Sequence, residues 1–176
     1  MTDPIHVSGL DELSAKLKAL PPRIAKNALR RSVSAGARVI RIEARNRAPI
    51  SASPRRRGSG MISKPGTLKR AAMSFSIREK SNQVQQTFGV AFKSGKKEQA
   101  KGRDAFYWKW VEAGHRIIPR RSKTGSNSGG IAARRKQHRG GFVQGRRFLR
   151  DAFNATAQRA IEAIKSKLSD DLAKLL

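Results

Sequence analysis

The chain contains no cysteine and no long apolar run. Without cysteine it can form neither a disulfide nor a cysteine-ligated metal site, and a reducing compartment such as the cytoplasm is permitted. No apolar segment approaches the roughly 20 residues that a membrane-spanning helix needs. The first residues carry neither the basic segment nor the apolar segment of a secretory signal. We therefore expect a soluble protein that is not secreted by this route and does not span a membrane.

Acidic residues are also scarce, because 12 Asp and Glu stand against 39 Lys and Arg and leave a formal charge of +27. Two windows, residues 44–78 and 113–150, contain no acid and hold just over half of the cations. Nothing local can neutralise those cations, so the charge predicts a polyanionic partner, which could be nucleic acid, anionic lipid or acidic protein. At 176 residues the chain is long enough for one domain, which we expect to span residues 1–176.

Apolar spacing predicts three helices. The first follows Ser8, carries a leucine stripe from Leu10 to Leu20 and stops at the two prolines that follow. The second runs from Pro22 to about Arg47, and its expected core face is Ile24, Ala28, Val33, Ala37, Ile40 and Ala44. The last runs from about Arg147 to Leu175, and its expected apolar stripe is Leu149, Phe153, Ala157, Ala160, Ile164, Leu168, Leu172 and Leu175.

The rest of the second helix is strongly basic, and its cations are Lys26, Arg30, Arg38, Arg41 and Arg45. Helices commonly expose Lys and Arg, so an ordinary solvated face is one interpretation. A face that follows the phosphates of DNA is the other.

Alternation of apolar and polar residues over 73–77 and 84–92 predicts an antiparallel hairpin that turns near Lys80 to Asn82. Residues of about 50–66 and 116–146 are rich in Ser, Gly and Arg, which predicts long, mobile basic loops. The expected fold class is therefore α+β. We expect a small antiparallel sheet packed against an N-terminal helical pair and a long C-terminal helix.

The densest aromatic cluster covers residues 106–110 and is followed by Gly114. The spacing favours a short helix with Gly114 as its C-terminal cap over a third strand. Three uses of the aromatic side chains remain open, namely core packing, a subunit interface and base stacking on single-stranded nucleic acid. Core packing is favoured because the chain has few other bulky side chains.

Residues suited to catalysis are few. Glu112 and His115 stand three apart, as metal ligands on a helix do, but no second such pair accompanies them. His115 with Pro119 resembles part of a metal-dependent nuclease site, but residues 113–150 lack the acids that would hold the metal. Lys123 lies in a segment of phosphate-binding composition without the order of a phosphate-binding loop. We expect no enzymatic activity, no metal and no cofactor.

Short landmarks, taken in order, resemble the neck or tail-completion proteins of long-tailed phages. This is the family of Z-like minor tail proteins. The landmarks are Gly9-Leu10-Asp11-Glu12-Leu13, Leu17, Leu20-Pro21, Ala48-Pro49, Gly66-Thr67-Leu68-Lys69, Tyr107, Val111-Glu112-Ala113-Gly114-His115 and Arg147-Phe148-Leu149-Arg150-Asp151-Ala152. The resemblance implies a structural virion protein of the neck, assembled in the host cytoplasm, that joins head and tail in a ring around the DNA channel. It implies three kinds of partner, which are further copies of the chain (expected to form a hexamer), the tail terminator and head-closure (connector) proteins, and double-stranded phage DNA.

Mobile Arg-rich loops would hold phosphates without reading bases. The residues assigned to DNA contact are Arg55, Arg56, Arg57, Arg120, Arg121, Lys123, Arg134, Arg135, Lys136 and Arg139. The residues expected to position these loops or neighbouring subunits are Trp108, Trp110, Glu112 and Phe148. The alternative function is a free basic nucleic-acid-binding protein of ribosomal or nucleoid type, and a metal-dependent nuclease is the least favoured.

Overall fold

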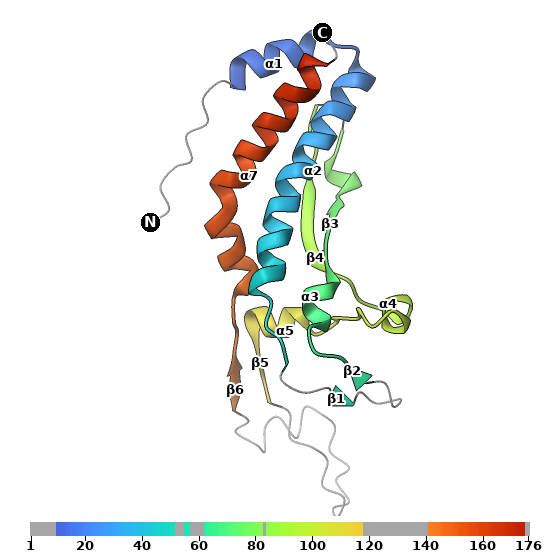
Figure 1. Ribbon diagram of the computed structural model, residues 1–176, viewed down its shortest axis with the longest axis vertical. Coiled ribbons are helices and arrows are strands. Elements are labelled where there is room, and N and C mark those ends of the chain that lie inside the picture. Colours follow the sequence, from blue (N-terminus) through green and yellow to red (C-terminus); the bar gives the residue numbers. More distant parts are fainter. Residues whose placement is uncertain (1–9, 52–54, 57–61, 83, 118–140, 175–176) are drawn as a thin grey trace, which may run out of the picture. The chain divides into compact units, whose positions relative to one another are not determined.

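The structure is a computed structural model that describes residues 10–51, 55–56, 62–82, 84–117 and 141–174 (Figure 1). The chain divides into two compact units. Unit 1 comprises Met1–Phe106 with Phe148–Leu176, and unit 2 comprises Tyr107–Arg147. The single domain expected over 1–176 stays a prediction. None of the helices in the described ranges is long and apolar enough to cross a membrane.

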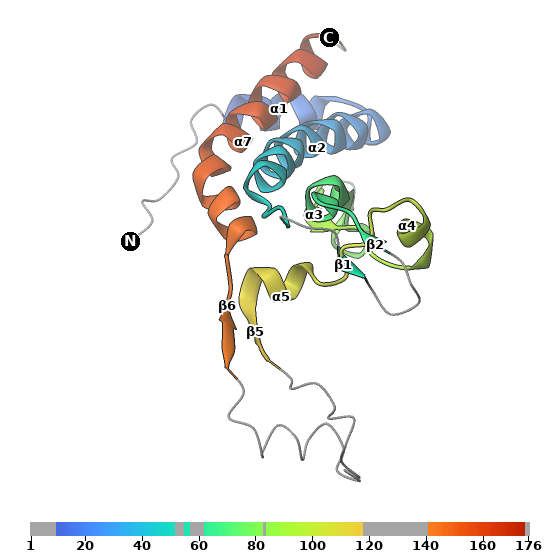
Figure 2. The ribbon, with the colours of Figure 1, turned by 60° about the horizontal axis from the view of Figure 1, so that its bottom comes forward.

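The three predicted helices are all present in unit 1. They are α1 (Leu10–Ala19), α2 (Pro22–Arg47) and α7 (Phe148–Ala173). Pro22 opens α2, where its missing amide hydrogen costs nothing because the first amides of a helix have no partner within it. Figures 1 and 2 show α2 and α7 side by side along much of their length, with α1 across one end of the pair.

The core of the helical layer combines leucines with small residues. Leu168 and Leu172 of α7 pack with Ala28 of α2, and the leucine stripe of α1 covers this cluster with Leu13, Leu17 and Leu20. The helices approach closely at Gly36, where an added Cβ would lie 2.6 Å from Cγ1 of Ile164 and 2.9 Å from the carbonyl oxygen of Ala160. The small residue therefore sets the separation of α2 and α7.

The predicted core faces of α2 and α7 need correction. Ile24 is 37% exposed and Phe153 is 54% exposed, although both were expected inside. The buried row of α7 instead begins one position earlier than predicted, with Phe148, Ala152, Thr156 and Ala160. Two buried residues are polar, and the hydroxyls of Ser32 and Thr156 donate to carbonyl oxygens one turn back at 2.8 Å and 2.7 Å. Hydroxyls satisfied in this way fit inside, so an apolar pattern alone misplaced the face.

The predicted hairpin is confirmed and lies against α2 (Figure 1). Strand β3 (Ala72–Ser76) pairs antiparallel with β4 (Phe88–Phe92), and Ala72 stands opposite Phe92. The second strand begins at Phe88 and not at Val84, which is 86% exposed. A short helical turn, η1 (Arg78–Lys80), precedes the connection. There Oδ1 of Asn82 accepts hydrogen bonds from the amides of Val84 and Gln85 and replaces strand pairing.

The remaining elements of unit 1 are short. Helix α3 (Thr67–Ala71) and helix α4 (Lys96–Ala100) flank the hairpin in the chain. Strand β1 (Arg55–Arg56) pairs antiparallel with β2 (Ile62–Ser63). The prediction that the whole segment of about 50–66 is an irregular loop is therefore wrong at these residues. Two residues per strand are too few to produce an alternating pattern in the sequence. The long helices and the confirmed sheet make the fold class α+β, as predicted.

Unit 2 contains α5 (Trp108–Ala113), β5 (Gly114–Arg116) and β6 (Phe142–Gln144). The predicted short helix with Gly114 at its C-terminal end is confirmed, and Gly114 has a φ of 82°. The predicted loop of about 116–146 is wrong at its ends, because β5 and β6 pair antiparallel with His115 opposite Val143. Residues 118–140 lie outside the described residues.

Candidate nucleic-acid and subunit interface

Few of the residues assigned to DNA contact belong to the described part of the chain. The backbone of Arg55 and Arg56 forms β1, with Arg55 opposite Ser63 and Arg56 opposite Ile62. The others lie outside the described residues, and they are Arg57, Arg120, Arg121, Lys123, Arg134, Arg135, Lys136 and Arg139. Their contact with DNA stays a prediction.

The aromatic cluster does not form a core. Phe106 of unit 1 is 49% exposed, Trp110 of unit 2 is 52% exposed, and α5 has no buried residue. The core-packing interpretation is therefore wrong for these side chains. A six-residue helix beside a pair of three-residue strands has too little surface to enclose bulky rings. The bulk of an aromatic side chain indicates where burial would be favourable, but it does not supply the surface that buries it.

Strand register places several exposed apolar side chains on one face of unit 2. Because His115 stands opposite Val143, and Ile117 donates its amide hydrogen to the carbonyl of Gly141 at 2.8 Å, these pairs share a face. The Trp110 ring lies over the same face, with its centroid 6.1 Å from that of His115. We call the set Trp110, His115, Ile117 and Val143 the ribbon face. Ile117 is 50% exposed and Val143 is 42% exposed, so a broad apolar surface is open.

Backbone contacts hold the ribbon face in place. The amides of Arg146 and Arg147 donate to the carbonyls of Val111 and Glu112 at 2.8 Å and 3.2 Å, which joins the end of α5 to the segment after β6. A Cβ on Gly145 would clash with the backbone of α5, so the two segments meet at a residue without a side chain. Glu112, which was expected to position loops or subunits, thus acts here through its backbone carbonyl.

The other two residues of the predicted positioning set lie in different settings. Trp108 is half-buried in unit 2, and the ammonium of Lys109 lies 5.8 Å from its ring centroid. Phe148 belongs to unit 1, is 3% exposed and packs edge-to-face on Phe92 with ring centroids 5.4 Å apart. Phe148 therefore anchors the start of α7 in the core, where it has no open surface for a neighbouring subunit.

Several landmarks of the resemblance have structural roles. Ala48 and Leu68 are buried, at 4% and 2% exposure. Gly66 adopts a φ of 73° before α3, and the hydroxyl of Thr67 donates to the carbonyl of Lys64 at 2.6 Å. Such positions hold elements together. Among the described residues, no group of three His, Cys, Asp or Glu could hold a metal ion.

Ion pairs engage a few of the cations of the helical layer. Asp171, which is 4% exposed, binds Arg31 of α2 at 3.2 Å and Lys167 at 2.9 Å. Glu43 binds Arg47 at 2.7 Å on α2 itself. The other basic side chains of α2 form no ion pair within the described ranges. The sequence left a DNA-following role for them open but did not place them in the DNA-contacting set.

One protein family matches the sequence. The model of the HK97-gp10-like family, whose description assigns it to the tail of bacteriophage HK97, matches residues 11–114. This range is more than half of the chain and extends from α1 to the glycine that caps α5. No curated protein and no solved structure matches the chain.

Proposed function

Because the chain belongs to the HK97-gp10-like family of phage tail components, we propose that it is a neck protein that joins head and tail as one subunit of a ring around the DNA channel. Family membership confirms the resemblance found in the sequence landmarks and makes the chain a structural component of the phage tail. The neck position, the ring and the contact with DNA are the finer parts of the proposal.

The ribbon face carries the proposal of a ring. A two-stranded ribbon is marginally stable by itself in water, and no described residue of unit 2 is buried. Covering Trp110, Ile117 and Val143 would supply the missing burial. We assign this role to a second copy of the chain, because within the described ranges β5 and β6 pair only with each other, and each copy brings another strand that can pair with their outer edges. A head-to-tail contact repeated from copy to copy forms a ring when the rotation between neighbouring copies closes on itself.

Contact with DNA is supported by the charge. A formal charge of +27 per chain would make neighbouring copies in a ring repel one another, and the phosphates of a duplex in the channel would offset that repulsion. Phosphate contacts are independent of base sequence, as a conduit for a whole genome requires. Tail terminator and head-closure proteins are the further partners of this proposal.

The ring is tested with the double variant Trp110→Ser, Val143→Ser. We expect light scattering to show an oligomer for the wild type and a monomer for the variant, because the variant loses the apolar area that a neighbour would cover. Phe153→Ser is the control, since Phe153 is an exposed aromatic residue of α7 outside the ribbon face. The far-ultraviolet circular dichroism of all three proteins should agree.

A particle assay extends the test to the neck. Phage lacking the wild-type protein should yield separate heads and tails in electron micrographs, and the variant should restore fewer joined particles than Phe153→Ser does. An oligomer of unchanged mass in the double variant would refute the ribbon face as the subunit contact. A wild type that stays monomeric even with its tail partners, yet binds nucleic acid, would favour the free nucleic-acid-binding alternative.

A further inference from the structure

Helix α2 carries a basic face that the loops assigned to DNA contact do not include. Its members recur at spacings of three, four and eight residues, and they are Arg23, Lys26, Arg30, Arg38, Arg41 and Arg45. At about 100° per residue these positions fall within roughly a third of the helix circumference. We call this set the α2 basic face.

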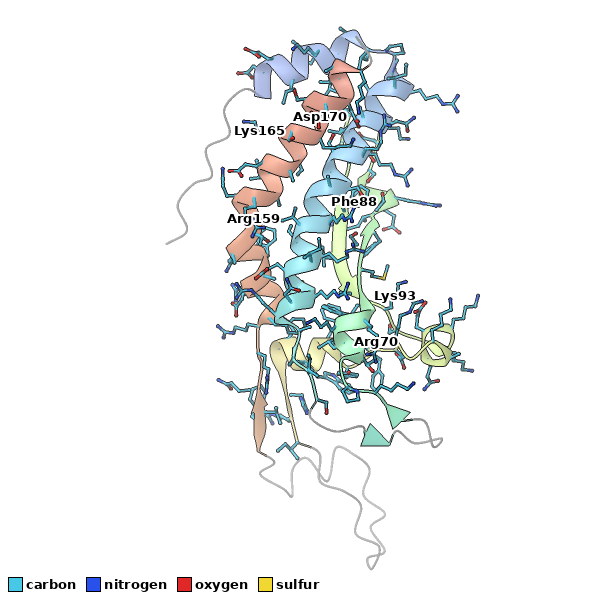
Figure 3. All side chains as sticks on the ribbon, viewed as in Figure 1. Arg70, Phe88, Lys93, Arg159, Lys165 and Asp170 are labelled. Atoms are coloured by element: carbon cyan, nitrogen blue, oxygen red, sulfur yellow. The ribbon has the colours of Figure 1, made fainter. Side chains whose placement is uncertain are left out.

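Burial on the rest of α2 leaves this face open to solvent. Ala28, Ser32 and Gly36 are buried on the side where α2 meets α7. Ala37 and Ala44 are also buried, at the Lys26 edge of the arc that holds the cations, so the α2 basic face is open mainly toward its other edge. Five members of the α2 basic face are exposed and Arg41 is partly buried. Figure 3 shows side chains ending in nitrogen projecting outward near the upper end of α2. Exposed cations are therefore found from the first turn of the helix to the last, between Arg23 and Arg45.

No acid in the described part of the chain forms an ion pair with the α2 basic face. The ion pairs of α2 engage Arg31 and Arg47, which are not members of it. No ion pair within the described ranges joins any of its six members to a carboxylate. Six like charges on one side of a helix repel one another, so an external polyanion would lower the free energy of the folded protein.

The composition of the face favours phosphate over an acidic protein. The residues between its cations include Asn27 and Ser34, which donate hydrogen bonds to phosphate oxygens in protein–DNA complexes. Protein interfaces are anchored by buried aromatic or large apolar side chains, and the face contains none. The exposed Ile24 and Ile42 lie beside it, at about 40° beyond its edge on the helix circumference.

The length of the face also fits a duplex. From Arg23 to Arg45 the helix rises about 33 Å, at roughly 1.5 Å per residue. One turn of B-DNA is about 34 Å long. A helix that lies along the duplex axis would therefore meet phosphates of both strands within one turn without entering a groove.

We propose that the α2 basic face binds the phosphate backbone of double-stranded DNA without regard to base sequence. This inference rests on the DNA contact in the proposed function and assigns that contact to an ordered helix in addition to the loops. The occupant is duplex DNA, and acidic protein is the competing outcome of the test.

The test is the triple variant Arg30→Gln, Arg38→Gln, Arg45→Gln, with a 30-base-pair duplex of arbitrary sequence as the probe. The slope of log K against log salt changes by about 0.9 for each phosphate contact, so the variant should lose close to three units of slope. Its affinity at 0.1 M salt should fall on the order of 100-fold. The variant Arg30→Lys, Arg38→Lys, Arg45→Lys keeps the charge and should retain the slope.

A charge-matched control separates local contact from net charge. Lys18→Gln, Arg159→Gln, Lys174→Gln removes the same charge from exposed positions of α1, of α7 and of the residue after α7, and should leave the slope within about one unit of the wild type. Thermal denaturation checks that each variant is folded. An equal loss of slope in this control would overturn the proposal.

Two further outcomes separate this inference from the proposed function. If the α2 variant keeps the wild-type slope while the wild type binds DNA, the contact belongs to the loops and only this inference fails. If that variant also yields fewer joined particles, the face serves an acidic protein partner, which equally overturns the assignment to DNA. If the wild type binds no duplex at all, the DNA contact of the proposed function fails as well.

Discussion

Phe148 joins the C-terminal helix to the core of unit 1. Its ring is 3% exposed and meets Phe92, the last residue of β4, edge-to-face. Aromatic pairs in this geometry contribute about 0.5–1.5 kcal/mol beyond the area that they bury. Residue 148 was expected to act at a loop or a subunit contact. Its burial gives it a different role, which is to connect α7 with the hairpin.

Replacing Phe148 tests this role at the level of a single side chain. Phe148→Ala should lower the free energy of unfolding by about 3–5 kcal/mol, because the ring leaves a cavity beside Phe92. Phe153→Ala, five residues along the same helix, should change it by less than about 0.5 kcal/mol because Phe153 is exposed. Urea denaturation measures both values. Equal losses for the two variants would contradict the core assignment.

The α2–α7 pair is the element on which unit 1 depends. Small and hydroxylated residues line α2 where it meets α7, and Ser32 and Gly36 are buried there. The hydroxyl of Ser32 donates a hydrogen bond to the carbonyl oxygen of Ala28 at 2.8 Å, which satisfies it inside the core. Gly36 lets the two helices approach closely because it has no side chain. Such a contact depends on shape more than on apolar area, since most of the side chains involved are small.

Gly36→Ala isolates that dependence. In an isolated helix alanine is about 1 kcal/mol more favourable than glycine. Here the new methyl group would meet both the Ile164 side chain and the carbonyl oxygen of Ala160, so we expect a net loss of stability of about 1–3 kcal/mol. Ile164→Ala removes both side-chain atoms that the methyl group would meet, Cγ1 and Cδ1, so the double variant should lose less than the sum of the two single losses. Calorimetry of the four proteins gives the coupling energy. A stability gain in Gly36→Ala would refute the close approach.

The net charge acts on the molecule as a whole. With +27 on 176 residues, the folded chain holds like charges closer together than the unfolded chain does. Screening lengths fall from about 30 Å at 0.01 M salt to about 10 Å at 0.1 M. Added salt therefore removes a repulsion that opposes folding.

Melting temperature should consequently rise between 0.01 M and 0.2 M sodium chloride. The rise should be smaller in the variant Arg30→Gln, Arg38→Gln, Arg45→Gln, which has fewer repelling charges, and differential scanning calorimetry measures both. Ion pairs such as Arg31 with Asp171 are weakened by salt and act in the opposite direction. A melting temperature that falls with salt would mean that these pairs outweigh the repulsion.

Local signals were sufficient for the larger elements. The spacing of leucines in α1, the prolines at 21 and 22 and the Ala48-Pro49 step predicted the helix boundaries, because a proline lacks the amide hydrogen and restricts its neighbour. Alternation of apolar and polar residues predicted the β3–β4 hairpin, because the two-residue period of side chains in a strand is also a local signal. Gly114 as the cap of α5 required only the sequence that surrounds it.

Longer-range features escaped prediction. The pairing of β5 with β6 joins residues 114–116 to 142–144, and no local pattern indicates partners so distant in the chain. Trp110 and Phe148 are both aromatic, yet Trp110 is exposed and Phe148 is buried. The difference depends on the surfaces that the fold places next to each of them. Hydrophobicity ranks side chains by their preference for burial, but the fold decides which of them are buried.

The amino-acid sequence alone determined the basic charge, the long helices, the α+β class and the relation to phage tail proteins. Each of these follows from composition or from short, ordered patterns. Tertiary structure was needed to separate the buried side of α2 from its basic face and to place Trp110, Ile117 and Val143 on one open surface. The physical reason is that burial and register are set by contacts between segments far apart in the chain. Charge and periodicity are properties of each segment by itself.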